Sequence, residues 1–412
     1  MILEVSLVFI ILTLLYFMVE ENKTSTSLIL LSALLNFICI IISWNSVKYF
    51  RIFSIILFII LLLLIIVFTT ENLLIFFVSY EAILVPVFAL IVIWGYRVER
   101  FKAAYYFFFY TLLGSIFMLS AIVYIYNQIG TYNLNYLLSI TFSNSAQLWL
   151  FLGFFTSLAV KIPKIPFHLW LPYAHVEAPV AGSVLLAGIL LKLGGYGFIK
   201  FSCPLFPIAS DYFSPFIITL SLIAIVYGGL ITIIQADIKR LIAYSSIAHM
   251  GLVTIAIFTW DFNASIGMML AHGLVSPMLF ILVTLLYDRF KTRLVRYYRG
   301  LLQTMPLFAI FFTLASLANM AVPLSCSFIG EYLCINAGFN YSFLVGFFST
   351  FGLVISATYS LYLLNRVIYS TNNNFLYLSR DLSRRENFFL IILISLVYIL
   401  GLFPNLFIYA IY

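Results

Sequence analysis

The sequence carries very little charge for its length. Asp, Glu, Lys and Arg make up 8% of the 412 residues, against about 25% in an average soluble domain, whereas hydrophobic residues make up 64%. The mean hydropathy of +1.15 is more apolar than a soluble core of this size can accommodate. The composition therefore excludes an ordinary soluble globular domain and predicts an all-α polytopic membrane protein.

Cysteines and phosphate-binding glycine motifs are also sparse. The cysteines Cys39, Cys203, Cys326 and Cys334 lie in or beside apolar segments without metal or redox spacing, so we interpret them as small packing residues. The sequence has no glycine-rich phosphate loop, because the cluster LKLGGYG at 191–197 lies inside an apolar run. We therefore expect no metal, nucleotide or redox cofactor on this chain.

The N-terminus lacks the marks of a cleavable signal peptide. The apolar run that starts at Val5 has neither a basic segment before it nor an A-x-A cleavage site after it. We interpret this run as a retained first membrane span.

Apolar runs of roughly 17–25 residues predict about 13 membrane spans. They lie near 2–19, 26–43, 52–70, 72–95, 104–126, 147–173, 178–199, 213–235, 241–258, 262–287, 306–340, 343–369 and 388–411. Two of them are too long and contain proline, at Pro163 and Pro166 in the first and at Pro323 in the second. Because freed backbone groups at membrane depth survive only against protein or a wet cavity, these broken spans point to an ion or substrate site.

The charges in the loops predict the orientation of the chain. One side of the predicted membrane holds Lys48, Arg51, Arg97, Arg100, Lys102, Lys239, Arg240, Arg289, Lys291, Arg293, Arg296, Arg299, Arg380, Arg384 and Arg385. The other side holds only Lys23 and Lys200. Since cytoplasmic or matrix loops carry the excess of Lys and Arg, the basic loops and the N-terminus are predicted on the inner side. The net charge of +7 thus reflects topology and not affinity for nucleic acid.

A small set of ionisable side chains remains near the centres of the spans: Glu81, Lys161, Lys192, His249, His272 and Glu331. A central Lys or Asp costs about 2.5–3.5 kcal/mol on insertion scales, and ionisable groups at such depth are functional by default. The alternative is that each is paired, snorkelling or a polar packing residue. For His249 we favour that alternative, and for His272 both interpretations stay open.

These residue types predict proton handling. Burial disfavours the charged form of lysine and of glutamate, so both can exchange protons near neutral pH. An interacting pair such as Glu81 and Lys161 would titrate as a unit, and histidines between lysines can relay protons through water.

Several stretches resemble one known family. The run VKIPKIPFHLWLPYAHVEAPVAGSVLLAGILLKLGGYGFIK at 160–200 closely resembles the chain 4 family of NADH:ubiquinone oxidoreductase (respiratory complex I), which is related to the membrane subunits of multisubunit Na⁺/H⁺ antiporters. Supporting stretches are SYEAILVP (79–86), IKRLIAYSSIAHMG (238–251), MLAHGL (269–274) and SLANMAVPLSCSFIGEY (316–332). The resemblance runs from about residue 55 to the C-terminus, and the first 50 residues match only in hydropathy.

The resemblance implies a fold of two inverted five-helix repeats, each with one broken helix. The expected parts are N-terminal helices (1–70), a first antiporter-like repeat (71–200), a second repeat (213–369) and a C-terminal helix (388–411). Because the family has about 14 spans, the count of 13 implies one N-terminal span fewer.

The resemblance also implies site residues for proton translocation. Glu81 matches the acidic partner of the first repeat, Lys161 the lysine at its broken helix and Lys192 the central bridging lysine. His272 matches the relay histidine of the second repeat, and Glu331 the acidic residue at the second broken helix.

Further positions are weaker candidates for the same pathway. His168 and His175 lie on the inner half of the first broken span, Glu177 is expected at its inner surface, and His249 is added as a polar residue of the second repeat. One motif departs from the family: this chain reads YDRFKTR at 287–293, with Lys291 where relatives have His, and we interpret Lys291 as a surface residue.

The family resemblance predicts partners and location. It implies a proton-pumping subunit in the membrane arm of complex I, next to other antiporter-like membrane subunits and lipid, with NADH, FMN, iron-sulfur clusters and ubiquinone on partner subunits and no nucleic acid. The heavy use of Phe (43) and Tyr (28) suits an organelle-encoded gene and predicts a mitochondrial inner membrane protein with its basic loops in the matrix. A bacterial or plastid membrane, a subunit of an Na⁺/H⁺ antiporter and a non-transporting membrane scaffold are the alternatives.

Overall fold

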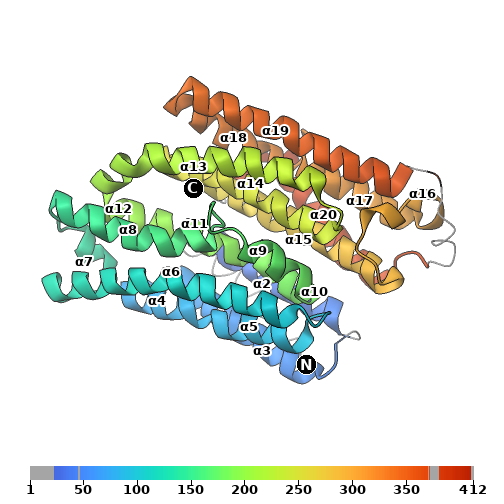
Figure 1. The fold of residues 1–412 in the computed structure, drawn as a ribbon, viewed down its shortest axis with the longest axis horizontal. Coiled ribbons are helices and arrows are strands. Elements are labelled where there is room, and N and C mark those ends of the chain that lie inside the picture. Colours follow the sequence, from blue (N-terminus) through green and yellow to red (C-terminus); the bar gives the residue numbers. More distant parts are fainter. Residues whose placement is uncertain (1–22, 45–46, 370, 372–379, 410–412) are drawn as a thin grey trace.

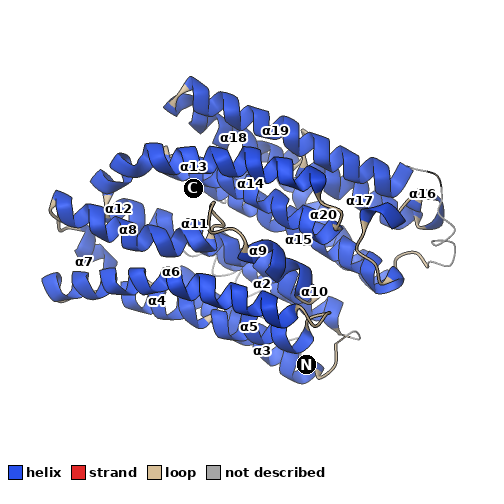
Figure 2. Ribbon diagram, viewed as in Figure 1, coloured by secondary structure: helices blue, strands red, loops and turns tan. Residues whose placement is uncertain are grey.

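A computed structural model describes residues 23–44, 47–369, 371 and 380–409, and nearly all of this part of the chain is helical (Figure 2). The predicted first span at 2–19 lies outside the described residues. The helical elements of the described residues are, in chain order, α2 (Lys23–Ser43), α3 (Phe50–Thr69), α4 (Leu73–Ala82), α5 (Leu84–Trp94), α6 (Arg100–Ile129), α7 (Leu134–Leu138), α8 (Asn144–Lys161), α9 (Trp170–Glu177), α10 (Val180–Leu185), the π-helical η1 (Leu186–Leu190), α11 (Leu191–Gly197), the π-helical η2 (Phe198–Ser202), α12 (Cys203–Leu205), α13 (Pro207–Ile234), α14 (Ile238–Phe258), α15 (Phe262–Phe290), the 3₁₀ turn η3 (Val295–Tyr297), α16 (Leu301–Thr304), α17 (Pro306–Asn319), α18 (Cys326–Tyr341), α19 (Phe343–Leu364), the π-helical η4 (Asn365–Tyr369), α20 (Arg384–Leu402) and α21 (Pro404–Tyr409).

The all-helical membrane fold is confirmed. Within the described residues, 10 helical stretches are long and apolar enough to cross a membrane. The pairs α8–α9 and α17–α18 are not among them: α9, α17 and α18 are too short, and α8, with 18 residues, has polar residues at both ends. The predicted count of 13 spans is therefore not confirmed as a number.

The helices lie side by side with their axes roughly aligned (Figure 1). Helices α3 to α6 lie along one flank of the molecule and α18 and α19 along the opposite flank, with α13, α14 and α15 between them. Almost every residue of α15 is buried, whereas α3 and α6 leave many large apolar side chains exposed. The exposed apolar flanks are what lipid or neighbouring membrane subunits would cover.

Both predicted helix breaks are present. Helix α8 ends at Lys161 and α9 begins at Trp170, so the chain leaves helical geometry across Pro163 and Pro166. Proline cannot donate a backbone hydrogen bond and clashes with the preceding turn, which accounts for this break. The second break, between α17 and α18, contains Pro323.

The second break passes very close to the C-terminal helix. A Cβ placed on Gly401 of α20 would lie 2.1 Å from the carbonyl oxygen of Leu324. Leu324 itself has a left-handed φ of 85°. Only a residue without a side chain lets α20 approach the break this closely.

Four of the expected spans contain interruptions that were not predicted, and one of these is the π-helical η4 at the end of the span expected at 343–369. The span expected at 72–95 is divided at Ile83 into α4 and α5, because Pro86 has no N–H to donate to the carbonyl of Ala82 one turn earlier. The span expected at 178–199 contains the π-helical segment η1 and the start of η2, and neither segment contains a proline that would predict it. The C-terminal span expected at 388–411 ends at Leu402, since Pro404 starts the separate helix α21.

The same loop pairing occurs twice in the chain. Residue Leu73 at the start of α4 donates its N–H to Tyr132, and Leu134 donates back to Glu71. At the start of α14, Ile238 donates to Arg293, and Val295 donates back to Ala236. In both places the residue before the helix, Asn72 or Asp237, also caps it by accepting a backbone N–H. The first pairing lies next to the sparsely charged side of the predicted topology and the second lies in the basic loops.

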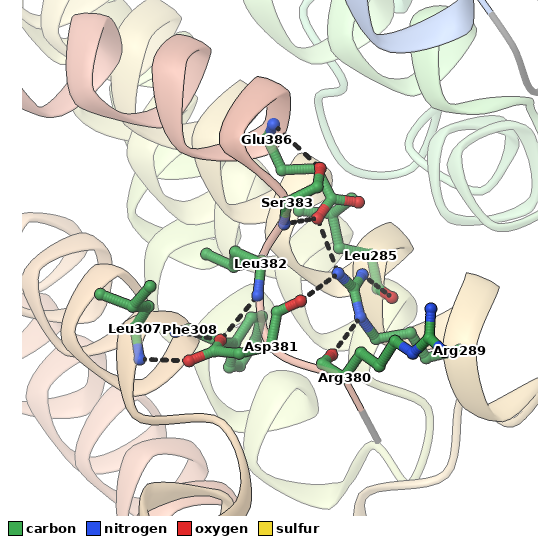
Figure 3. A network of polar contacts seen from close by, with 9 residues as sticks. All are labelled: Leu285, Arg289, Leu307, Phe308, Arg380, Asp381, Leu382, Ser383 and Glu386. Atoms are coloured by element: carbon green, nitrogen blue, oxygen red, sulfur yellow. Dashed lines mark hydrogen bonds and ion pairs between the residues drawn. The ribbon is translucent and has the colours of Figure 1, made fainter. Parts of the chain in front are cut away.

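A polar network fastens α20 to the rest of the second half of the chain (Figure 3). The guanidinium of Arg289, in the last turn of α15, forms a 2.6 Å ion pair with Glu386 of α20 and donates to the carbonyls of Arg380 and Asp381. The Asp381 carboxylate accepts the N–H groups of Leu307 and Phe308 in the first turn of α17. One loop thus caps α17 and holds the ends of α15 and α20 together.

Candidate functional site

The first broken helix presents Lys161 to α4. Its side chain is 6% exposed, and its Nζ lies 3.7 Å from the nearest carboxylate oxygen of Glu81. The same Nζ donates to the carbonyl of Tyr80 at 2.6 Å and lies over that residue's ring. Glu81 is the penultimate residue of α4, two positions before the interruption at Ile83. The predicted Glu81–Lys161 pair is therefore in place, at the junction of two helix interruptions.

The π-helical segment η1 ends two residues before Lys192, which lies in α11. The Nζ of Lys192 donates to the carbonyl of Ala187, five residues back in the chain, and contacts Nδ1 of His272 at 2.9 Å. Lys192 is fully buried, and within the described residues none of the ion pairs involves it. A buried amine without a carboxylate partner is costly to charge, so contact with a proton-accepting imidazole is chemically significant.

Two glycines set the distance between Lys192 and His272. A Cβ on Gly273 of α15 would lie 3.1 Å from the carbonyl oxygen of Gly188 and 3.6 Å from Cε of Lys192. On the facing segment, a Cβ on Gly188 would meet Pro277 at 3.1 Å and overlap the side chain of Leu35. Small residues let helices in a membrane approach closely, and here they bring an amine on one helix to an imidazole on the next.

His272 lies beside a second pair of ionisable groups, His249 and Glu331. The ring of His249, from α14, has its centroid 5.6 Å from that of His272. Nδ1 of His249 lies 3.0 Å from Oε1 of Glu331 on α18, and its Nε2 lies 3.4 Å from the hydroxyl of Tyr359 on α19. His249 is thus paired with a buried carboxylate, which agrees with the satisfied polar residue favoured from the sequence and also leaves it in line with His272.

The structure brings Lys192, His272, His249 and Glu331 into one row that crosses from α11 through α15 and α14 to α18. All four side chains are buried. Imidazole can accept a proton at one nitrogen while it donates from the other. Among the described residues, no hydrogen bond or ion pair joins this row to Glu81 and Lys161, which form a separate pair on α4 and α8.

The three weaker candidates on the first broken span have different surroundings. His175 is fully buried, stacks on Phe280 with ring centroids 4.7 Å apart, and neither ring nitrogen has a hydrogen-bond partner within the described residues. A buried imidazole of this kind is normally satisfied by ordered water. His168 places its ring near that of Tyr227 on α13, with 6.3 Å between centroids.

Glu177, which was expected at the inner surface, is buried within the protein. Its carboxylate forms a 3.1 Å ion pair with Arg293, and both side chains are almost fully buried. Arg293 and Lys239 were both assigned to the basic loops; Lys239 is 0% exposed and donates to the carbonyl of Ala178. Loop charges in this chain are therefore not all solvated, because the loops fold back onto the ends of the helices.

Sequence reasoning missed one further buried charge. Lys164, inside the first break, is 2% exposed and bonds to α13. Its place between Pro163 and Pro166 was the available signal, since a lysine in an intramembrane break cannot reach the membrane surface as readily as one at a helix end. Among the described residues, no group of three or more His, Cys, Asp or Glu side chains has a geometry that could hold a metal ion.

Comparison with known proteins agrees with this arrangement. Residues 70–357 match the family described as NADH:quinone oxidoreductase/Mrp antiporter, TM. The chain is 53% identical over 382 residues to NADH-ubiquinone oxidoreductase chain 4 of Metridium senile, which covers 92% of this chain and 78% of the relative.

Two solved structures are similar to the whole described fold. A chain of respiratory complex I from Thermus thermophilus with bound NADH has a TM-score of 0.88 and 28% identity, covering 94% of this chain and 83% of that one. A chain of the Mrp complex from Dietzia has a TM-score of 0.85 over 94% of this chain and 82% of that one. At 18% identity, the second likeness concerns the fold alone. The extent and identity of these matches establish that the chain belongs to the NADH-ubiquinone oxidoreductase chain 4 family, within the wider family of NADH:quinone oxidoreductase and Mrp antiporter membrane proteins.

Proposed function

We propose that this chain is an antiporter-like membrane-arm subunit of NADH:ubiquinone oxidoreductase and translocates protons, coupled to electron transfer from NADH to quinone on other subunits. The observation that carries the proposal is the buried row of Lys192, His272, His249 and Glu331. Four ionisable groups buried in contact or near contact have no purely structural need, because apolar residues of similar volume would pack at lower cost.

The row can conduct a proton by a simple sequence. A proton on Lys192 is donated to Nδ1 of His272, whose other nitrogen can then release a proton towards His249. The ring of His249 then becomes imidazolium beside the Glu331 carboxylate, which stabilises that charge. The 5.6 Å between the two ring centroids requires a ring rotation or one bridging water for the central step.

The pair Glu81–Lys161 acts as the coupling element of the first half. At 3.7 Å, the glutamate stabilises the charged lysine, so any movement of Glu81 away from Lys161 favours proton release. Both residues border a helix interruption, where backbone geometry can change without breaking a regular helix. We propose that Lys161 holds the proton at the first break and that the position of Glu81 controls when this proton is released.

We propose that the remaining candidates connect the buried ionisable groups to the side of the membrane that holds the basic loops. His175, buried and without a protein hydrogen-bond partner among the described residues, is proposed as a hydrated step between that side and Lys192. His168 is proposed for a similar role at the break, and Glu177 for orienting Arg293. The doubled loop pairing at the starts of α4 and α14 supports an inverted repeat over 71–200 and 213–369.

The proposed setting is the mitochondrial inner membrane, with the basic loops in the matrix. The partners are other complex I subunits, above all adjacent antiporter-like membrane subunits, together with lipid. NADH, FMN, iron-sulfur clusters and ubiquinone are expected on those partner subunits and not on this chain. The names of the relatives and the basic loops support this setting.

The test is proton pumping by the intact complex with Glu81→Gln, Lys161→Met or Lys192→Met. Each change is expected to lower the number of protons moved per electron by about half or more, while the complex still assembles. Normal stoichiometry in all three variants would support the membrane-scaffold alternative and overturn the proposal. Copurification with NADH-oxidising subunits separates the complex I assignment from the Na⁺/H⁺ antiporter alternative, in which only transporter subunits would copurify.

A further inference from the structure

Lys164 is a second buried lysine on the first helix break. It follows Lys161 by three residues, yet the two amines point to different helices. Lys161 contacts Tyr80 and Glu81 of α4. Lys164 donates to the hydroxyl of Ser221 and to the carbonyl of Ile217, both on α13. The break therefore directs one lysine into the first half of the chain and the other towards the second half.

The contacts of Lys164 contain oxygen acceptors but no carboxylate. Its side chain is only 2% exposed, and none of the ion pairs in the described part of the chain includes it. An ammonium group buried without a counter-charge is strongly destabilising, whereas the neutral amine is tolerated. A side chain in this position gains or loses a proton more readily than it moves to the membrane surface.

The acceptors of Lys164 extend into a short polar chain. The hydroxyl of Ser221 contacts that of Thr254 on α14 at 2.9 Å, and both residues are 0% exposed. A hydroxyl can donate and accept at once, so Ser221 can turn its lone pair towards the amine when the amine is charged. These polar contacts reach α14, the helix that carries His249.

We propose that Lys164 is a proton-holding residue of the translocation cycle, with Ser221 and Thr254 as positioning residues that stabilise its charged form. This inference rests on the proposed function. In each cycle the neutral amine binds one proton and the ammonium later releases it, so no bond other than N–H forms or breaks.

The experiment compares variants of the intact complex for NADH oxidation and protons moved per electron. Lys164→Gln keeps a donor for Ser221 but cannot be protonated, and it is expected to lower the proton-to-electron ratio by about half, as is Lys164→Met. Lys164→Arg keeps the positive charge but does not release it, and the ratio is expected to stay low. Lys102→Gln, a change to an exposed lysine in the first turn of α6, is the matched control and should leave the ratio unchanged.

The outcomes separate this inference from the proposed function. A normal ratio in Lys164→Gln or in Lys164→Arg would overturn the inference, because a hydrogen bond or a fixed charge would then suffice. If Lys161→Met also pumps normally, the proposed function fails with it; if only the Lys164 variants are normal, that function stands. Should the Lys164 variants not assemble, Ser221→Ala tests the same chain, and it must lower the ratio whereas Ser221→Thr restores it.

Discussion

The amine of Lys192 and the imidazole of His272 are in direct contact, 2.9 Å apart, although 80 residues separate them in the chain. The contact exists because Gly273 and Gly188 let α15 approach the segment that carries Lys192. The site and the packing of the helices thus depend on the same two glycines.

Replacement of His272 by Ala should interrupt the row while it leaves the Glu81–Lys161 pair intact. General acid–base groups contribute about 100-fold or more to a proton-transfer step, so the pumping rate should fall by at least about 10-fold. His272→Gln, which keeps polarity but does not relay protons, should be equally impaired. Proton uptake by vesicles containing the complex measures this, and wild-type pumping by His272→Gln would contradict the relay.

Gly273→Ala should separate Lys192 from His272. The added Cβ would lie 2.6 Å from Cδ2 of Leu31 and 3.1 Å from the carbonyl oxygen of Gly188, and overpacking of this kind costs about 1–3 kcal/mol. The matched control is Gly338→Ala in α18, whose Cβ would meet its nearest atom at an ordinary 3.4 Å. Thermal stability of the complex and its proton-to-electron ratio should both fall for the first variant only, and equal behaviour of the two would argue against a special role for this crossing.

Loss of Arg293 should destabilise the chain through the charge that it leaves behind. Arg293→Ala would strand the buried carboxylate of Glu177, and breaking a buried ion pair costs about 3–5 kcal/mol. The double variant Glu177→Gln with Arg293→Met removes both charges and should recover much of that loss. Unfolding temperature in detergent gives the comparison, and a double variant no better than Arg293→Ala would refute the explanation.

Asp381 should act as a helix cap supplied from a distant part of the chain. It accepts the N–H groups of Leu307 and Phe308, so Asp381→Ala should cost about 0.5–2 kcal/mol, whereas Asp381→Asn, which retains an acceptor, should cost less (Figure 3). Hydrogen exchange at the first turn of α17 is the direct readout. Unchanged protection in Asp381→Ala would show that α17 does not need the cap.

Lys291 should be dispensable for pumping. It is exposed and ends α15 with a left-handed φ of 56°, a conformation that glycine and asparagine adopt at lower cost. Lys291→Asn is therefore expected to keep the proton-to-electron ratio and to preserve or slightly raise stability. A fall in that ratio would assign Lys291 to the proton path, against its interpretation as a surface residue.

Hydropathy and proline placement were sufficient to predict the helical fold and both long breaks. They did not predict η1, the π-helical segment before Lys192. Such a segment arises from packing against neighbours, and no pattern of proline or glycine in the sequence predicts it. The division at Ile83 did have a signal in Pro86, which a window average over an apolar run conceals.

Individual site residues were easier to predict than their contacts. A charge in the middle of an apolar run is visible in the sequence, as Glu81 and Lys161 were. That His249 pairs with Glu331 depends on how α14 packs against α18, and no periodicity encodes that register. The burial of Lys239 and Arg293 was missed for a related reason: the loop pairing at Asp237 folds both residues inward, which only the tertiary structure specifies.

The interruption at Ile83 has a consequence for hydration. Pro86 supplies no N–H, so the carbonyl of Ala82 lacks the donor that an unbroken helix would give it. An acceptor of this kind deep in a membrane is satisfied by water or by a polar side chain. The interruption therefore leaves a backbone acceptor one residue away from Glu81, and a water bound to it would be an available proton carrier for the first half of the chain.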